Sequence, residues 1–266
     1  MPDAIIAADP KFSAAQADSN PILWLALTLT PGLGPTRSGA WSSSSAPWTA
    51  SSAHRSPNSK PPGYPCSRRR RWLGSVEFAN EETARAAAAD VRLLAFDDPA
   101  YPTRLRQIYD PPLVLYMRGN SAALSLPGVA VVGTCHPTPY GTRMAERLSC
   151  DLATRSLVIF SGLAHGVDTA AHRGAIAGKG KTVAMFGTGV DVLYPKENSR
   201  LSEQILSFDG ALVSAFPLGT FAAPQNFPIR NRIISGISLG ELVVEAAEYS
   251  GTRITARCAL EQGRDV

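Results

Sequence analysis

One stretch of the chain combines glycines and polar residues at a spacing suited to binding an anion. Residues 161–174 read Ser-Gly-Leu-Ala-His-Gly-Val-Asp-Thr-Ala-Ala-His-Arg-Gly and follow the apolar run 157–160. The run predicts a buried strand, and the residues after it predict a turn that opens a helix. Gly162 and Gly166 let the backbone approach a ligand, and Asp168 is the expected N-cap, whose following N–H groups would face that ligand. The stretch therefore predicts either a phosphate site or a tight turn whose glycines serve only packing.

Three further glycine turns follow apolar runs that predict strands. They contain Gly133, residues 187–189 and residues 250–251. Ligands of an open parallel sheet bind beyond the carboxyl ends of its strands, so we expect all four turns to meet at one rim. Several cations in a row match a nucleic-acid backbone better than a single nucleotide, although each alone is also typical of a solvated surface. Phe227 adds a ring on which an unpaired base can stack. The polar residues expected around the turns are Lys181, Lys196, Asn198, Arg230, Asn231 and Arg232.

Enzymatic readings of the same residues are weaker. A dehydrogenase would carry G-x-G-x-x-G after its first strand, whereas Gly133 begins no such pattern and residues 187–189 hold only a G-x-G fragment. Asp168 and His172 lie one helical turn apart and could share a proton, but no nucleophile or metal set accompanies them, which favours a packing or capping role for His172. The scattered cysteines lack zinc or disulfide spacing, so we expect reduced thiols, no metal and no cofactor; they are Cys66, Cys135, Cys150 and Cys258.

The net charge of +4 does not by itself point to nucleic acid. Residues 37–74 hold seven Lys and Arg and no acidic residue, which leaves 19 basic and 22 acidic residues in the rest of the chain. Any argument for nucleic acid must therefore come from placed residues. No apolar run approaches the length of a membrane span, and no signal peptide is evident, so we expect a cytoplasmic protein.

The N-terminal part reads as a disrupted helical domain. Residues 20–29 predict a helix, and the glycine turn 31–35 predicts a hairpin corner that either presents N–H groups to a DNA phosphate or only joins two helices. Residues 38–65 contain no Val, Ile, Leu, Met or Phe and lead into the arginine run 68–71. We therefore expect a helical remnant over 1–37 and a disordered, low-complexity segment over 38–74, whose tryptophans also fit translation out of frame.

The remainder, residues 75–266, predicts an α/β domain. A helix over 76–89, strands over 91–96 and 111–119 and a short helix over 105–108 are expected to form an extra β-layer. From Gly128 onward, strands and helices alternate, and the strands are apolar on both faces. This alternation predicts an extended Rossmann-like parallel sheet with helices on both faces. Residues 265–266 resemble the start of another strand, so we expect the domain to be truncated at its C-terminal end.

These motifs together resemble the DprA/Smf family of DNA-processing proteins. They span residues 91–266 in the family's order, and residues 20–37 resemble the family's small N-terminal helical domain. The motifs that carry the resemblance are residues 131–134 with 140–141, 161–172, 187–191 with 194–198, 226–236, 244–246 and 250–256.

The resemblance implies a non-enzymatic protein that binds single-stranded DNA at the rim, mainly through the phosphate backbone. Family members protect incoming DNA in natural transformation, load a RecA-type recombinase and act as homodimers. The DNA-binding residues expected here are Gly133, Thr134, Ser161, Gly162, His165, Lys181, Lys196, Asn198, Phe227, Arg230, Asn231, Arg232, Ser250 and Gly251.

The chain also departs from the family's pattern. Cys135 and His165 stand where the family has arginine, and Ala215 stands where it commonly has glutamate. A neutral histidine cannot replace arginine's permanent charge, so we expect weakened binding. Two other functions stay open: an enzyme acting on a nucleotide-derived small molecule, and an inactive remnant. A contact with many phosphates predicts affinity that falls steeply with salt, whereas one enclosed nucleotide predicts a weak dependence.

Overall fold

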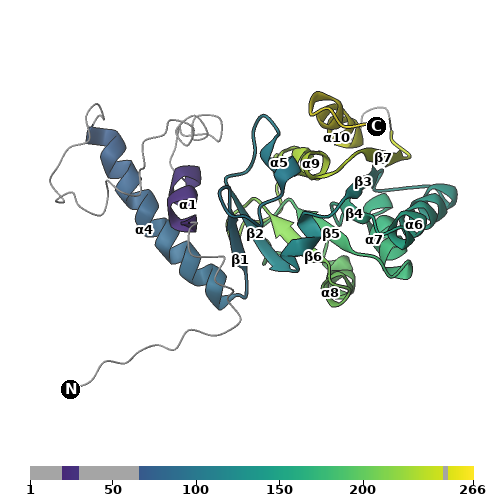
Figure 1. Ribbon diagram of the computed structural model, residues 1–266, viewed down its shortest axis with the longest axis horizontal. Helices are drawn as coiled ribbons and strands as arrows, with labels where there is room; N and C mark the ends of the chain where they lie inside the picture. The colour runs from purple at the N-terminus through teal and green to yellow at the C-terminus, as the bar shows by residue number, and fades with distance from the viewer. Residues whose placement is uncertain (1–19, 30–65, 248–250) are drawn as a thin grey trace, which may run out of the picture.

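The computed structural model describes residues 20–29, 66–247 and 251–266. Its centre is a seven-stranded sheet with the order β1-β2-β6-β5-β4-β3-β7 (Figure 1). The five strands from β6 to β7 in this order run parallel, which confirms the predicted Rossmann-like sheet. The strands are β1 (Arg92–Ala95), β2 (Val114–Gly119), β3 (Gly128–Gly133), β4 (Val158–Ser161), β5 (Thr182–Phe186), β6 (Ala211–Ser214) and β7 (Glu241–Val244).

Strands β1 and β2 belong to this same sheet, so the expectation of an extra β-layer is wrong. β2 pairs antiparallel with β6, with Tyr116 opposite Ser214, and β1 pairs antiparallel with β2. Pairing satisfies the backbone N–H and C=O groups along β6, which would otherwise form an open edge. Periodicity identifies a strand but not its partner, which is why the sequence pattern missed this continuity.

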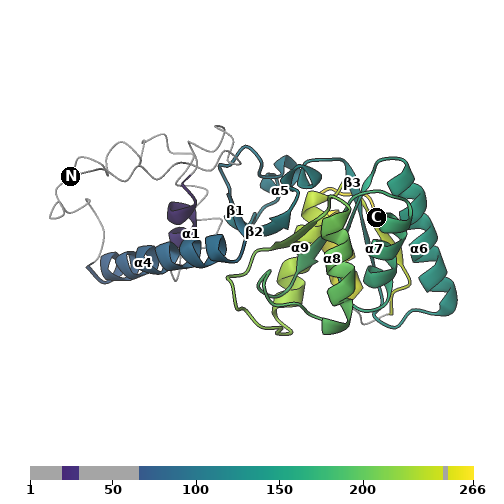
Figure 2. The ribbon, with the colours of Figure 1, turned by 90° about the horizontal axis from the view of Figure 1, so that it is seen from below.

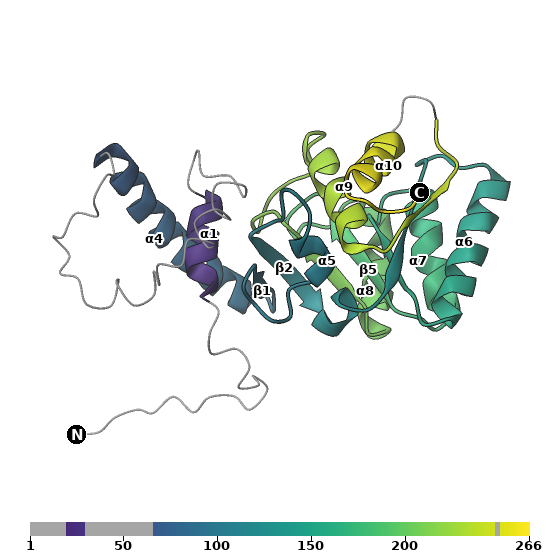
Figure 3. The same cartoon turned by 45° about the horizontal axis from the view of Figure 1, so that its top comes forward.

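Helices cover both faces of the sheet, as predicted. α5 (Thr103–Arg106) and α9 (Asn226–Ile237) lie on one face, and α10 (Gly251–Glu261) packs against α9 (Figure 3). The other face carries α6 (Pro139–Thr154), α7 (Val167–Ala177) and α8 (Ser199–Ser207) (Figure 2). Alternate residues of one strand serve the two faces: Phe160 packs in the cluster under α9 and Ile159 in the cluster under α6 and α7. No described helix is long and apolar enough to cross a bilayer.

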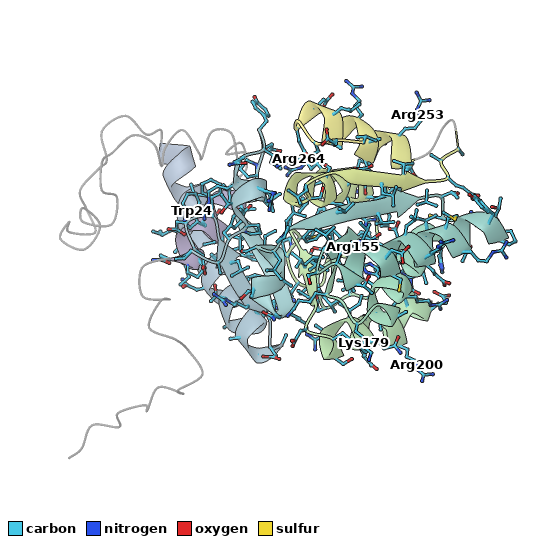
Figure 4. All side chains as sticks on the ribbon, turned by 45° about the vertical axis from the view of Figure 1, so that its right-hand side comes forward. Trp24, Arg155, Lys179, Arg200, Arg253 and Arg264 are labelled. Atoms are coloured by element: carbon cyan, nitrogen blue, oxygen red, sulfur yellow. The ribbon has the colours of Figure 1, made fainter. Side chains whose placement is uncertain are left out.

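Two N-terminal helices pack beside the β1–β2 end of the sheet. α1 (Pro21–Leu29) matches the predicted helix, and Leu25 is buried with Ala79 and Ala86 of α4 (Cys66–Ala88). Trp24 of α1 is labelled in Figure 4. Its ring centroid lies 5.6 Å from that of Phe96.

Helix α4 begins ten residues before the predicted start at residue 76. Residues 66–74 are therefore helical, and the expectation of disorder over that part of 38–74 is wrong. Arginine is a good helix former, and the run 68–71 extends the helix that the pattern placed further on. The glycine turn 31–35 and residues 38–65 lie outside the described residues.

The last residues lie beside β7. Asp265 forms a parallel bridge with Gly240, and its carbonyl accepts the N–H of Glu241 at 2.8 Å. This is the pairing expected if residues 265–266 start a strand. Together, the sheet and its covering helices place the carboxyl ends of five parallel strands at one edge of the molecule.

Candidate nucleic-acid interface

The carboxyl ends of the parallel strands lead into the turns that the sequence singled out. We call these segments the rim: residues 134–138 after β3, 162–166 after β4, 187–198 after β5, 215–225 after β6 and 245–247 after β7. Gly251, which begins α10, is exposed, while Ser250 lies outside the described residues. The expected convergence of the glycine turns is therefore present for Gly133, Gly162 and residues 187–189.

Asp168 has a different role from the one expected. α7 begins at Val167 with Gly166 as its N-cap, so the expectation that Asp168 caps the helix is wrong. Its carboxylate instead accepts the N–H of Gly162 at 3.1 Å and that of Ala164 at 3.4 Å. Burial raises the pKa of Asp168, while Arg230 and these N–H groups oppose the rise. The turn amides that would bind a phosphate are thus occupied by a carboxylate of the chain itself.

Arg230 lies underneath this turn. Only 5% of the residue is exposed, and its Nη1 donates to the carbonyl of Met185 at 3.1 Å and lies 4.0 Å from Oδ2 of Asp168. A Cβ added at Gly162 would come within 1.3 Å of Nη1. Gly162 is therefore needed because the guanidinium packs against it. Arg230 acts as the buried counter-ion of Asp168.

Two other expected contact residues hold the same turn in place. Ser161 is fully buried, and its hydroxyl donates to the carbonyl of Val131 at 2.7 Å. Asn198 is 5% exposed, and its Nδ2 donates to the carbonyl of Leu163 at 2.8 Å and to the hydroxyl of Thr169 at 2.9 Å. Both side chains face inward and shape the rim from below.

A second carboxylate occupies the start of α6. Glu245 accepts the N–H of Thr138, the N-cap residue, at 2.8 Å and also accepts its hydroxyl. These bonds lower the pKa of Glu245. The carbonyl of Glu245 accepts the N–H of Thr134 at 2.9 Å, which fixes the turn after Gly133. A helix N-terminus favours an anion, and here the chain supplies it.

The expected position of Lys181 at the rim is wrong. Lys181 directly precedes β5 and pairs with Asp209, which lies just before β6, at 3.4 Å. It is therefore at the amino ends of the strands, and the length of β5 separates it from Gly187 by roughly 20 Å. The sequence shows that Lys181 flanks a strand, but the direction of that strand decides which edge it joins.

The residues after Arg230 point to neighbouring elements. Arg232 pairs with Asp110 at 3.4 Å, and 21% of its side chain is exposed. Nδ2 of Asn231 donates to the carbonyl of Gly251 at 3.4 Å and so joins α9 to the start of α10. Neither residue is fully solvated. Arg232 therefore connects α9 to the segment before β2, and Asn231 connects α9 to α10.

The exposed part of the rim combines polar and aromatic side chains. Lys196, Cys135 and His165 are exposed, and Nε2 of His165 lies 3.9 Å from Glu197. Phe227 is partly exposed, and its ring packs on Gly187, where an added Cβ would lie 2.8 Å from it.

Two exposed aromatic residues were not among the expected site residues. Tyr194 is 52% exposed, with its ring centroid 5.9 Å from that of Phe227, and Phe221 is 74% exposed. The sequence shows aromatic residues in the loops after β5 and β6, but the approach of Tyr194 to Phe227 depends on the fold.

His172 is a packing residue, as the sequence favoured. It is fully buried, and Nδ1 lies 2.7 Å from the hydroxyl of Thr182. That hydroxyl donates to the carbonyl of Ile159, so Nδ1 is the donor toward Thr182. Burial lowers the pKa of His172 to about 3, so it stays neutral. Within the described residues, no group of His, Cys, Asp and Glu could hold a metal ion, and Cys135, Cys150 and Cys258 are free thiols.

These features define the class of the protein. It is an extended Rossmann-like α/β protein in which Asp168 and Glu245 accept N–H groups of the turns at the strand ends. The family model of DNA recombination-mediator protein A matches residues 92–266, and the chain belongs to this family.

Relatives and solved structures agree with this assignment. The chain is 47% identical to protein Smf of Escherichia coli over 175 residues, which are 65% of this chain and 46% of that protein. It is 45% identical to the DNA processing protein DprA of Streptococcus pneumoniae, over 64% of this chain and 59% of that protein. The chain thus spans about half the length of these relatives.

The X-ray structure of DprA from Streptococcus pneumoniae superimposes with a TM-score of 0.68 at 38% identity, covering 77% of this chain and 70% of that one. DprA from Helicobacter pylori superimposes with a TM-score of 0.57 at 30% identity, covering 61% and 74%. The Helicobacter pylori protein is described as having a unique single-stranded DNA binding mode.

Proposed function

We propose that the protein binds single-stranded DNA across the rim. The observation that carries the proposal is the aromatic pair of Tyr194 and Phe227, partly exposed beside Lys196 at the ends of the parallel strands. Aromatic rings stack on unpaired bases of any sequence, and cations follow the backbone. The Helicobacter pylori relative, described as binding single-stranded DNA, supports the same ligand.

The carboxylates that the chain itself places at the rim argue against the alternative function, an enzyme that acts on a nucleotide-derived molecule. Asp168 already accepts two N–H groups of the turn after β4, and Glu245 accepts the N–H of Thr138, the N-cap residue of α6. A Rossmann nucleotide site uses such groups for phosphate. A phosphate entering there would meet a negative charge. We therefore propose a non-enzymatic role without a cofactor.

Family membership supports a wider role, which we propose for the whole protein. It would act in the cytoplasm, protect incoming DNA in natural transformation and assist a RecA-type recombinase, with a homodimer as the working form. Protection of DNA has a direct test: an oligothymidine bound to the protein should resist a single-strand nuclease. Light scattering of the purified chain measures its oligomeric state.

The decisive experiment is a titration of labelled oligothymidine, followed by fluorescence anisotropy at several salt concentrations. Each phosphate neutralised in a single strand contributes about −0.7 to the slope of log K against log salt, so we expect a slope of roughly −1 to −3. Excess dTMP should compete poorly. A slope near zero together with tight dTMP binding would instead favour the nucleotide enzyme, and no binding at low salt would contradict the proposed function.

A further inference from the structure

A buried glutamate links the N-terminal helices to the rim. It lies outside the rim and outside residues 92–266, which the family model matches. Glu82, on α4, is 1% exposed. Its Oε1 accepts the N–H of Leu218 at 2.7 Å, and its Oε2 accepts Nη1 of Arg85 at 2.9 Å. One side chain of α4 thus holds the backbone of the loop between β6 and α9.

The side chain of Leu218 is buried in the cluster that joins the N-terminal helices to the sheet. It is 7% exposed, and this cluster contains Ala79 and Ala86 of α4 as well as Phe186 and Val190 beside the rim. The backbone N–H of this loop residue is therefore anchored on α4, and its side chain lies in a core that α4 shares with the rim. The loop itself, residues 215–225, contains no strand or helix that would fix it from within.

The other side of the loop contacts the rim. The carbonyl of Thr220 accepts the N–H of Gly189 at 2.9 Å, and Gly219 donates to the carboxylate of Asp191 at 2.9 Å. The next residue is the exposed Phe221, and the loop then leads into α9 with Phe227. A displacement at Leu218 would therefore be transmitted to the turn at 187–191 and to the exposed aromatic rings.

We propose that Glu82 is a positioning residue through which α4 fixes the position of loop 215–225. The N-terminal helices would thereby tune the affinity for DNA without contacting the DNA. The proposal rests on the proposed binding of single-stranded DNA. The ionic partner Arg85 is 53% exposed, and its Nη2 also lies near the loop, 3.6 Å from where a Cβ on Gly219 would be. The bond to Leu218, not the negative charge, carries the effect.

Variants of the full chain separate the bond from the charge. Glu82→Gln keeps an oxygen for the N–H of Leu218 and loses the charge, so we expect affinity within twofold of the parent. Glu82→Ala removes the acceptor, and Glu82→Asp keeps the charge but shortens its reach; both should weaken oligothymidine binding by about three- to tenfold. Glu81→Ala, at the exposed neighbour on the same helix, is the matched control for charge and helix propensity.

Two readouts are needed, both at a temperature well below every melting transition. Hydrogen exchange of the peptide covering residues 215–221, without DNA, reports the loop, and anisotropy reports the affinity. We expect faster exchange and weaker binding together in Glu82→Ala and Glu82→Asp. A purely structural role would lower the melting temperature and leave the affinity of the folded protein unchanged. If Glu82→Ala does not fold, the comparison of Glu82→Asp with Glu82→Gln decides.

The outcomes are distinct. A parent that binds no oligothymidine contradicts the proposed function before any variant is made, and with it this coupling. A parent that binds, with Glu82→Asp and Glu82→Ala equal to it in affinity, overturns the coupling alone. Equal losses in Glu82→Gln and Glu82→Ala would also overturn it, because the charge rather than the bond to Leu218 would then be responsible.

Discussion

At positions 135 and 165 the rim exposes side chains without a permanent charge. Cys135 lies in the turn after β3, and burial raises the pKa of its thiol, so it remains neutral near pH 7. His165 lies in the turn after β4. Both side chains are exposed where single-stranded DNA would cross the rim. Neither supplies the fixed fork of donors with which arginine binds phosphate bidentately.

We predict that Cys135→Arg and His165→Arg each tighten binding of oligothymidine about three- to tenfold at low salt, because each adds a phosphate contact. The gain should shrink at high salt and steepen the salt slope. Anisotropy titrations measure it. Thr154→Arg, at the exposed end of α6 on the opposite edge, is the control and should change affinity less than twofold. Equal gains in all three variants would point to net charge instead of the rim.

Tyr194 is the more exposed ring of the aromatic pair at the rim. Its half-exposed ring beside Phe227 offers a stacking face, and loss of such a face costs about 1–3 kcal/mol per base. Tyr194→Ala should therefore weaken binding by about tenfold, while Tyr194→Phe should bind like the parent. Phe208→Ala removes a ring that is 40% exposed at the end of α8 and serves as control. An unchanged affinity in Tyr194→Ala would remove base stacking at this residue from the proposal.

The turn between β4 and α7 is built around a buried ion pair. Asp168 holds the turn amides, Arg230 of α9 neutralises Asp168, and Gly162 makes room for the guanidinium. Breaking a buried pair from one side leaves an uncompensated charge, which costs about 3–5 kcal/mol. The same contacts dock α9 against the strand ends.

We predict that Gly162→Ala lowers the free energy of unfolding by roughly 2–3 kcal/mol, because its Cβ displaces Nη1 of Arg230 from a packed site. Arg230→Ala should cost a similar amount or more. Gly162→Ala with Arg230→Ala should cost at least about 1 kcal/mol less than the sum, since the clash is gone. Urea denaturation of the four proteins measures this cycle. Strict additivity would mean that Gly162 is required for another reason.

Glu241 couples the folding of the protein to pH. This residue at the start of β7 is 5% exposed, and within the described residues neither carboxylate oxygen has a hydrogen-bond partner. Burial, with a smaller contribution from Asp168, raises the pKa of Glu241 to about 7. The folded state therefore binds this proton more tightly than the unfolded state.

Protonation of Glu241 therefore stabilises the folded state. The stability that Glu241 contributes is present at acidic pH and is lost as pH rises from about 4.5 through about 7, by at most about 3 kcal/mol. Glu241→Gln should remove this loss. We predict that the stability of Glu241→Gln minus that of the parent, from urea denaturation, grows between pH 5 and pH 8. A constant difference would show that Glu241 stays charged in the fold.

The sequence predicted the architecture well because its signals are local. Apolar runs of strand length alternate with helical segments, and glycines after the runs locate the turns after β3, β4 and β5. One exception was the antiparallel pairing of β2 with β6, since one strand's pattern does not contain its partner. Another was the start of α4, which lies ten residues before the predicted one.

The site was predicted less well, because its side chains are assigned by contacts between distant residues. The sequence alone determined that Ser161 and Lys181 lie at the ends of strands, and that Asn198 and Arg230 follow later strands of a Rossmann-like sheet. Tertiary structure decided that Arg230, Asn198 and Ser161 turn inward and that Lys181 lies at the opposite edge. It also decided that Glu82 reaches Leu218, 136 positions away. Composition and spacing fix which groups are available, but burial and strand direction decide which of them meet.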